Sequence, residues 1–487
     1  MKMVKSLLLG SAAGLVAVAG AQAADLPVKA KPVQYVKICS LYGVGFYYIP
    51  GTDTCIRFSG YIRSDYNFNG RTPQVSGANG AQDRTPNRYT TRHRANFSTD
   101  VRTQTGYGTL RAVTSMNFDV AEGNTTASSP NKAYIQWGGF FFGRKESFVD
   151  HEGSIGDGGM KSLYTGLVDS TTGAAGINSI AYTWQLGGGA MLAIGADEPR
   201  SGSLFNASNA NGLTLGTDPT TARAGVSHPD PYIALRVSQA WGRASIALIG
   251  HENAGLYYAS GAGCTQANTT LCGHPSDVWG YAVLGGAEIF LPMLSPGSRI
   301  GFYGTYGVGA SRIVVNSQTS PGLFGAGGPG QGQIAFGWMT DAVFITGGNL
   351  ELTTGWAAGG GLEYYWTRNF SNMVYGGYTQ FSYNSNVING RWFCGGAAAS
   401  ANVTFTAGNA CDPGYSLYQV GIVSNWYPMG TSGGLRLAVD VLYTGINTAM
   451  NGQTVTLNKS IGARPTGAYA ITNQGLTTVM VRAQRNW

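Results

Sequence analysis

Charged residues are scarce in this sequence of 487 amino acids, at 11% against roughly 25% in typical soluble domains. Long apolar runs are missing too, because beyond residue 23 no uninterrupted run approaches the roughly 20 residues that a membrane-spanning helix requires. An integral membrane protein of this composition would therefore have to be a closed β-barrel. Glycine, with 74 residues, and tyrosine, with 27, are abundant instead, which suits tight turns and interfacial aromatic girdles.

Motifs for enzymatic chemistry are absent or misplaced. Neither HExxH nor GxxxxGK[ST] occurs, so the sequence offers no hydrolytic metal site and no phosphate-binding loop. A GxGxxG match at 325–330 is interrupted by Pro329 and lacks a flanking strand and helix, and a GxSxG match around Ser432 lies in a short turn. His151 stands beside Glu152, but no serine is placed to complete a catalytic pair. We predict no enzyme, no metal and no cofactor.

The N-terminus carries an export signal. Lys2 and Lys5 precede an apolar stretch at 7–19, which is followed by Ala21-Gln22-Ala23. This pattern predicts a secretory signal peptide at 1–23, and the absence of a composition shift predicts one barrel domain over 24–487. Without the two signal lysines the formal net charge falls from +7 to +5 (7 − 2), and no dense basic stretch indicates a nucleic-acid partner.

The six cysteines of an exported chain indicate disulfides, because the periplasm and the cell surface are oxidising. They fall into three local couples: Cys39 with Cys55, Cys264 with Cys272, and Cys394 with Cys411. Sequence permits other connectivities, and free thiols remain an alternative. We expect pairing between nearest neighbours, since the couples are separated by long stretches and the histidines do not fall at zinc-type spacing.

The C-terminal segment alternates with period two. One face carries Thr477, Val479, Val481, Ala483 and Trp487, and the other carries Thr478, Met480, Arg482, Gln484 and Asn486. Since successive side chains of a strand point to opposite faces, one face can meet lipid and the other water. Taken alone, the pattern also fits an amphipathic strand of a soluble sheet.

The same alternation recurs along the chain. The first three strands, near 56–65, 92–102 and 110–119, place on their polar faces Arg57, Arg63, Arg92, Arg94, Arg102 and Arg111. Further candidates lie near 131–138, 139–149, 179–187, 189–198, 230–240, 242–254, 276–291, 298–313, 355–367, 369–384, 415–427 and 433–446. With the last strand this predicts an all-β transmembrane antiparallel barrel of about 16 strands, wide enough for an aqueous lumen.

Short glycine-containing junctions alternate with long polar connections, the pattern of bacterial outer-membrane barrels. The signal per strand is weak, so one pair of strands more or fewer remains open. The stretch 333–346 is the place where an additional strand is most readily missed.

Residues 35–61, YVKICSLYGVGFYYIPGTDTCIRFSGY, closely resemble the N-terminal segment of the porins of alphaproteobacteria. The resemblance continues through AYIQWGGFFFGRKESFVD at 133–150, LELTTGWAAGGGLEYYW at 350–366 and the aromatic C-terminus, and so covers essentially the whole mature chain. It implies a 16-stranded homotrimer in the outer-membrane lipid, assembled there by the barrel assembly machinery, that lets small hydrophilic solutes and ions diffuse passively. Members of such families often end in Phe, and Trp487 departs from that pattern.

In the porins that this chain resembles, the third long loop folds inward and narrows the lumen. The corresponding segment, roughly 149–178, contains the carboxylates Asp150, Glu152, Asp157 and Asp169. Acid on this loop, facing the arginines of the first three strands, would set a transverse field that orients dipolar solutes. Alternatively, several of these charges only solvate the lumen or hold the loop by ion pairs.

Two functions remain open at this point. The first is a general-diffusion porin, and the second is a channel selective for sugars or anions, which an aromatic ladder through the lumen would favour. An outer-membrane barrel enzyme or an adhesin-like structural barrel is a more distant possibility. Saturable solute flux distinguishes the selective channel, and lipid hydrolysis by the purified protein would indicate the enzyme.

Overall fold

The computed structural model describes residues 37–72, 75–121, 127–154, 162–164, 168–209, 212–258, 273–316, 320–325, 332–394, 401–406, 411–431, 434–461 and 464–487. The predicted signal peptide, Asp157, the Cys264 and Cys272 couple and Ser432 lie outside these residues, as does much of the GxGxxG match. The chain divides into two units, 1–56 and 57–487.

In the first unit, the described residues form a closed loop. A 3₁₀ turn, η1 (Ser40–Tyr42), is followed by β1 (Tyr47–Tyr48), which pairs antiparallel with the first residues of β2 (Cys55–Phe68). The Cys39–Cys55 disulfide closes the loop, which confirms the first predicted pair. The Lys37 ammonium lies 4.9 Å from the centre of the Tyr48 ring.

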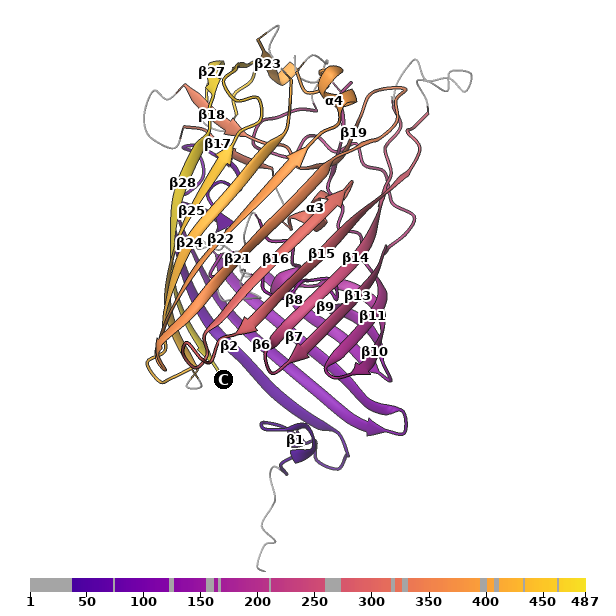
Figure 1. The fold of residues 1–487 in the computed structure, drawn as a ribbon, viewed down its shortest axis with the longest axis vertical. Coiled ribbons are helices and arrows are strands. Elements are labelled where there is room, and N and C mark those ends of the chain that lie inside the picture. The colour runs from indigo at the N-terminus through magenta and orange to yellow at the C-terminus, as the bar shows by residue number, and fades with distance from the viewer. Residues whose placement is uncertain are drawn as a thin grey trace, which may run out of the picture. The chain divides into compact units, whose positions relative to one another are not determined.

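The second unit is a closed antiparallel barrel (Figure 1). In order around the wall its strands are β2, β6 (Tyr89–Thr105), β7 (Gly108–Ala121), β8 (Ala127–Trp137), β9 (Phe140–Lys145), β10 (Ile177–Gly187), β11 (Ala190–Asp197), β13 (Asp230–Gln239), β14 (Gly242–Asn253), β15 (Val278–Phe290), β16 (Arg299–Val308), β21 (Thr354–Thr367), β22 (Phe370–Ser382), β24 (Tyr415–Trp426), β25 (Leu435–Asn447) and β28 (Gln474–Asn486). Each pairs with its neighbours, and β28 returns to β2, where Ser64 lies opposite Ala483. The prediction of 16 strands is confirmed.

The alternation along β2 shows why these sequences form a barrel wall. Phe58 and Ile62 point outward, with 58% and 48% of their surface exposed, whereas Arg63 and Asp65 point inward and are 4% and 0% exposed. The assignment of polar side chains to the interior therefore holds in the first strand. Short turns join the strands at one end of the barrel, and glycines permit them: Gly138 and Gly139, between β8 and β9, have φ of 57° and 94°.

The other end of the barrel carries the long connections, and these fold into small sheets of their own (Figure 1). Their elements are β3 (Gly70–Thr72), β4 (Val75–Ser76), β5 (Gly80–Gln82), η2 (Gly173–Ala175), β12 (Ser203–Asn206), α3 (Ser311–Val314), β17 (Pro321–Leu323), β18 (Gln333–Phe336), β19 (Thr340–Phe344), β20 (Glu351–Leu352), α4 (Ser385–Asn389), β23 (Val403–Phe405), β26 (Thr454–Leu457) and β27 (Gly467–Ile471). The stretch 333–346 thus forms β18 and β19, which pair with loop strands and not with the barrel wall.

A hydrophobic core holds these connections together. Trp338 is fully buried against Phe393, with 4.8 Å between ring centres, and Phe393 also contacts Phe205 at 5.1 Å. The Cys394–Cys411 disulfide lies in the same region and confirms the third predicted pair. Among the described residues, no helix is both long and apolar enough to cross a membrane.

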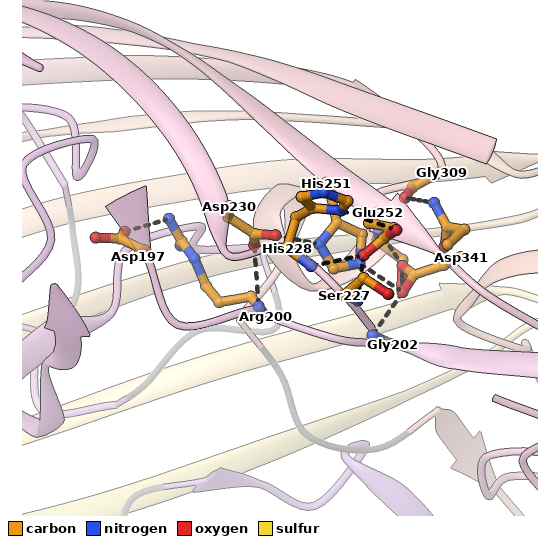
Figure 2. A network of polar contacts seen from close by, with 12 residues as sticks. Asp197, Arg200, Gly202, Ser227, His228, Asp230, His251, Glu252, Gly309 and Asp341 are labelled. Carbon is orange, nitrogen blue, oxygen red and sulfur yellow. Dashed lines mark hydrogen bonds and ion pairs between the residues drawn. The ribbon is translucent and has the colours of Figure 1, made fainter. Parts of the chain in front are cut away.

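A polar network fastens two of the long connections to the ends of β13 and β14 (Figure 2). The His251 ring donates a 2.8 Å hydrogen bond from Nδ1 to the Asp230 carboxylate, and its other nitrogen lies 3.5 Å from Asp341. Asp341 also pairs with Arg223 and accepts hydrogen bonds from the Gly202 and Ser311 amides at 2.6 and 2.7 Å. The loops at this end are therefore fixed by buried charge as well as by apolar packing.

Candidate functional site

The connection between β9 and β10 folds into the barrel. The Leu163 amide donates to the carboxylate of Asp440 on β25 at 2.8 Å, and the Tyr164 hydroxyl donates to Asn67 on β2 at 3.1 Å. The returning part lies against another wall, since the Tyr303 hydroxyl of β16 donates to the carbonyl oxygen of Val168 at 2.8 Å. Contacts with strands so far from β9 around the barrel confirm the inward-folded loop.

Glycines let the backbone of this inserted loop lie directly on the wall. Gly153 has φ of 75°, and a Cβ there would come 2.2 Å from the carbonyl oxygen of Ala287. On the strand side, a Cβ on Gly286 would come 2.2 Å from the carbonyl oxygen of Glu152. Because neither position tolerates a side chain at such distances, the loop is seated where the sequence supplies a glycine on both partners.

A carboxylate surrounded by arginines lies beneath the tip of the inserted loop. Asp65 is fully buried, 2.6 Å from both Arg92 and Arg482 and 3.6 Å from Arg63. Arg482 is also fully buried and donates to the carbonyl oxygen of Leu163 at 3.4 Å. This cluster joins the first strand, the last strand and the loop tip in one ion network.

Arg482 and Asp65 were not among the predicted site residues. The sequence places both on inward faces, but Arg482 and Asp65 are 417 positions apart and meet only because β28 pairs with β2. The alternation of the last strand identified the inward face on which Arg482 lies. Only the pairing of the last strand with the first would have identified Asp65 as its partner.

A second arginine cluster is more open to the lumen. Asp100 accepts two hydrogen bonds from Arg102 and two from Arg111, between 2.7 and 3.0 Å, and lies 3.7 Å from Arg57. The side chains of Arg57, Arg102 and Arg111 are 41%, 24% and 31% exposed, respectively. Three guanidinium groups share one carboxylate, so this wall carries a net positive charge. Arg94 differs, because it is held one-to-one by Asp119 through two bonds of 2.6 Å.

The described carboxylates of the inserted loop do not face these arginines. Asp150 accepts hydrogen bonds from the amide and hydroxyl of Thr172 at 3.0 and 2.5 Å. Asp169 accepts from the hydroxyl groups of Ser154 and Thr171, both at 3.0 Å. Burial raises the pKa of both carboxyl groups against the effect of these donors. Both side chains therefore hold the base of the loop together.

Glu152, the remaining described loop acid, faces the strands opposite β2, β6 and β7. It lies 3.2 Å from Arg236 and 3.6 Å from Arg243. The ion pairs continue along this wall, because Arg243 also pairs with Glu288, Arg299 lies 2.5 Å from Glu288, and Arg299 lies 2.9 Å from Glu363. From β14 to β21, base and acid therefore alternate from strand to strand.

His151 packs in the wall-facing side of the loop. Its ring stacks on Tyr303, with centres 4.3 Å apart and planes 5° from parallel, and it shares a 2.7 Å hydrogen bond with the Ser170 hydroxyl. Burial lowers the pKa of His151 to about 4, so the imidazole is neutral near pH 7. Its contacts are those of a packing residue, and within the described residues no cluster of ligands suited to a metal ion occurs.

Comparison with known proteins shows which protein family this chain resembles. A family model described as "Porin subfamily" matches residues 25–464. Porin Omp2b of Brucella suis biovar 1 (strain 1330) is 36% identical over 256 residues, covering 49% of this chain and 63% of that protein. Porin Omp2a of Brucella ovis is 37% identical over 222 residues, covering 40% of this chain and 59% of that protein. The matches thus span less than two thirds of either relative.

Among solved structures, the crystal structure of the outer membrane channel DcaP of Acinetobacter baumannii has a TM-score of 0.54 at 14% identity. The match covers 90% of this chain and 99% of that one. At this identity the likeness concerns the fold alone.

Replacing Asp65 by Asn should leave three buried guanidinium groups without their carboxylate. Breaking a buried ion pair from one side costs about 3–5 kcal/mol, so we expect a clearly lower midpoint of urea unfolding, followed by tryptophan fluorescence. Asp119→Asn is the matched control, since it removes the partner of the single arginine Arg94. A midpoint for Asp65→Asn no lower than that of the control would contradict the importance of the cluster.

The loop base should weaken in acid. The packed loop favours the neutral form of His151. The contribution of His151 to the stability of the packed loop is therefore fully present above its ordinary pKa of 6.5, and it decreases as the pH falls from 6.5 to about 4. The shift corresponds to about 3 kcal/mol at most. His151→Phe keeps a ring on Tyr303 but cannot be protonated, while the opposite contributions of Asp150 and Asp169 are common to both proteins. Amide hydrogen exchange of residues 146–154, compared between the two proteins from pH 7 to about pH 4, measures the difference. Identical pH profiles of the two proteins would disprove the role of His151 in this acid weakening.

Proposed function

Because this chain belongs to the porin subfamily, we propose that it forms a water-filled channel for passive diffusion of small hydrophilic solutes and ions. The observation that carries this proposal is the closed barrel of 16 strands with a charged inner face. A barrel of about eight strands is filled by side chains, whereas about 16 strands leave an aqueous lumen. Family membership likewise favours a channel over an enzyme.

The protein is a multi-pass β-barrel of the bacterial outer membrane. In such barrels the short turns face the periplasm and the long loops face the outside. The sheets and apolar core formed by the long connections therefore belong to the extracellular side. Export through the predicted signal peptide at 1–23, and insertion of the remaining 24–487 as one domain by the barrel assembly machinery, are part of the proposal.

The inserted loop would narrow the lumen. The arginines around Asp100 would dominate the electric field inside the lumen. The loop carboxylates Asp150 and Asp169 are engaged in loop packing, and Glu152 is matched by Arg236 and Arg243. The Asp100 wall keeps an excess of positive charge at partly exposed side chains. Such a field orients dipolar solutes and favours anions over cations.

The working unit is a homotrimer in this proposal, with family membership as its support. Purified protein in a planar lipid bilayer should therefore give stepwise conductance, and high voltage should close it in three equal steps. A monomeric mass in mild detergent together with single-step closure would exclude the trimer. Absence of any conductance would exclude the channel itself.

Replacing Arg57, Arg102 and Arg111 together by Gln should shift the reversal potential in a salt gradient toward cations, because Asp100 then remains as the local charge. The shift should shrink as salt rises, since the screening length falls from about 10 Å at 0.1 M to about 3 Å at 1 M. Arg368→Gln, in the exposed turn between β21 and β22, removes a positive charge outside the cluster and serves as the control. A reversal potential equal to that of the control at low salt would mean that other residues set the ion preference.

A further inference from the structure

A polar cavity of about 260 Å³ lies between the base of the inserted loop and the wall formed by β13, β14 and β15. It is lined by charged side chains of both signs, among them Lys145, Glu152, Arg236, Arg243 and Glu288. Since one water molecule occupies roughly 30 Å³ of liquid, a cavity of this size has room for a small solute together with some water. The cavity is distinct from the arginine cluster around Asp100, which contributes none of its lining residues.

The carboxylates of this cavity already have partners in the protein. Glu146 lies 2.6 Å from Lys132, which is on the neighbouring strand. Glu152 pairs with Arg236, and Glu288 pairs with both Arg243 and Arg299. Asp150 turns its carboxyl group to Thr172, 2.5 Å from the hydroxyl oxygen.

Lys145 is the exception among the cations. Its ammonium nitrogen lies 3.6 Å from the centre of the Phe148 ring and 5.4 Å from that of Phe141. No carboxylate of the described residues forms an ion pair with it. An ammonium group has three N–H donors, and an aromatic face attracts its charge without supplying an oxygen acceptor. The aromatic rings thus hold Lys145 at the cavity, and the N–H groups of its ammonium donate to no protein oxygen of the described residues.

The two cavity arginines are engaged by protein oxygens. Arg236 binds Glu152 and the carbonyl oxygen of Asp150, and Arg243 binds Glu288. Their Nε atoms are buried, so a solute in the cavity does not reach them. Lys145 is therefore the lining cation that offers its N–H donors to a solute. A ligand that brings oxygen acceptors and one or two negative charges would complete the arrangement.

We propose that this cavity is a weak binding site for small anions that carry a carboxylate or phosphate group, with Lys145 as the residue that contacts them. The proposal rests on the proposed channel function, because the lumen is the route by which a solute reaches the cavity. A weak site beside the diffusion path raises the local concentration of such anions and makes their flux saturable. The chain would then combine general diffusion with a preference for one chemical class.

Inorganic phosphate is a suitable probe. With the purified protein in a bilayer, phosphate replaces part of the chloride at constant ionic strength, and we expect a saturable decrease in single-channel current. Lys145→Gln should raise the half-saturating phosphate concentration about threefold to tenfold, the range for loss of one charged contact in a partly exposed site. Lys145→Arg keeps the charge and should retain the saturation. Acetate in place of phosphate separates carboxylate from phosphate recognition.

Arg368→Gln is the control, because it removes a positive charge in the exposed turn between β21 and β22, and Arg368 does not line the cavity. It should leave the half-saturating concentration nearly unchanged. Equal values for Lys145→Gln and wild type would overturn the proposal, as would a linear response of the wild type to phosphate while chloride current is normal.

Equilibrium binding tests the cavity without any transport. Broadening of the phosphorus NMR line of phosphate by the detergent-solubilised protein should be reduced in Lys145→Gln and retained in Lys145→Arg. Absence of chloride conductance with this binding intact would refute the channel and leave the anion site standing. Broadening that is equal in all variants would refute the anion site by itself.

Discussion

Closure of the barrel by the pairing of β28 with β2 is the constraint on which the other features depend. In a bilayer, no water is available to hydrogen-bond an exposed strand edge, so the first and last strands have to satisfy each other. That pairing brings Arg482 to Asp65 and, with Arg63 and Arg92, creates a buried ion cluster. Arg482 of this cluster donates a hydrogen bond to the carbonyl oxygen of Leu163 in the inserted loop. Closure and loop placement are therefore coupled.

The interior divides its charges into two kinds. Those at Asp65 and at the loop base are buried in contacts with the loop or the wall, so they stabilise the loop in its position. Those around Asp100 are partly exposed and outnumber their carboxylate three to one, and our proposal assigns the field in the lumen to them. Burial thus separates the arginines that contact the loop from those to which we assign the ion preference, although the sequence presents both in the same alternating pattern. Arg92 and Arg102 belong to one strand face, yet one is buried beneath the loop and the other faces water.

The inserted loop shows how small residues position a functional segment. Gly153 and Gly286 allow main chain to contact main chain, and the stacked ring of His151 on Tyr303 fixes the adjoining turn. The same seating leaves a cavity beside Lys145, whose ammonium group meets aromatic faces instead of a carboxylate. A movement of residues 151–153 away from the wall would break these contacts together.

The sequence by itself determined the barrel, because strand alternation depends only on neighbours in the chain. The faces of β2 and β28 follow from local pattern. A count of about 16 strands and the nearest-neighbour pairs Cys39–Cys55 and Cys394–Cys411 were expected from pattern and spacing, with other counts and connectivities still open, and the structure confirms them. Only the tertiary structure decided the partners of the charges: Glu152 lies with Arg236 and Arg243, and Asp150 with Thr172. The reason is physical, since side-chain direction is set by the local backbone, whereas an ion pair across a lumen depends on barrel closure and on where a loop comes to rest.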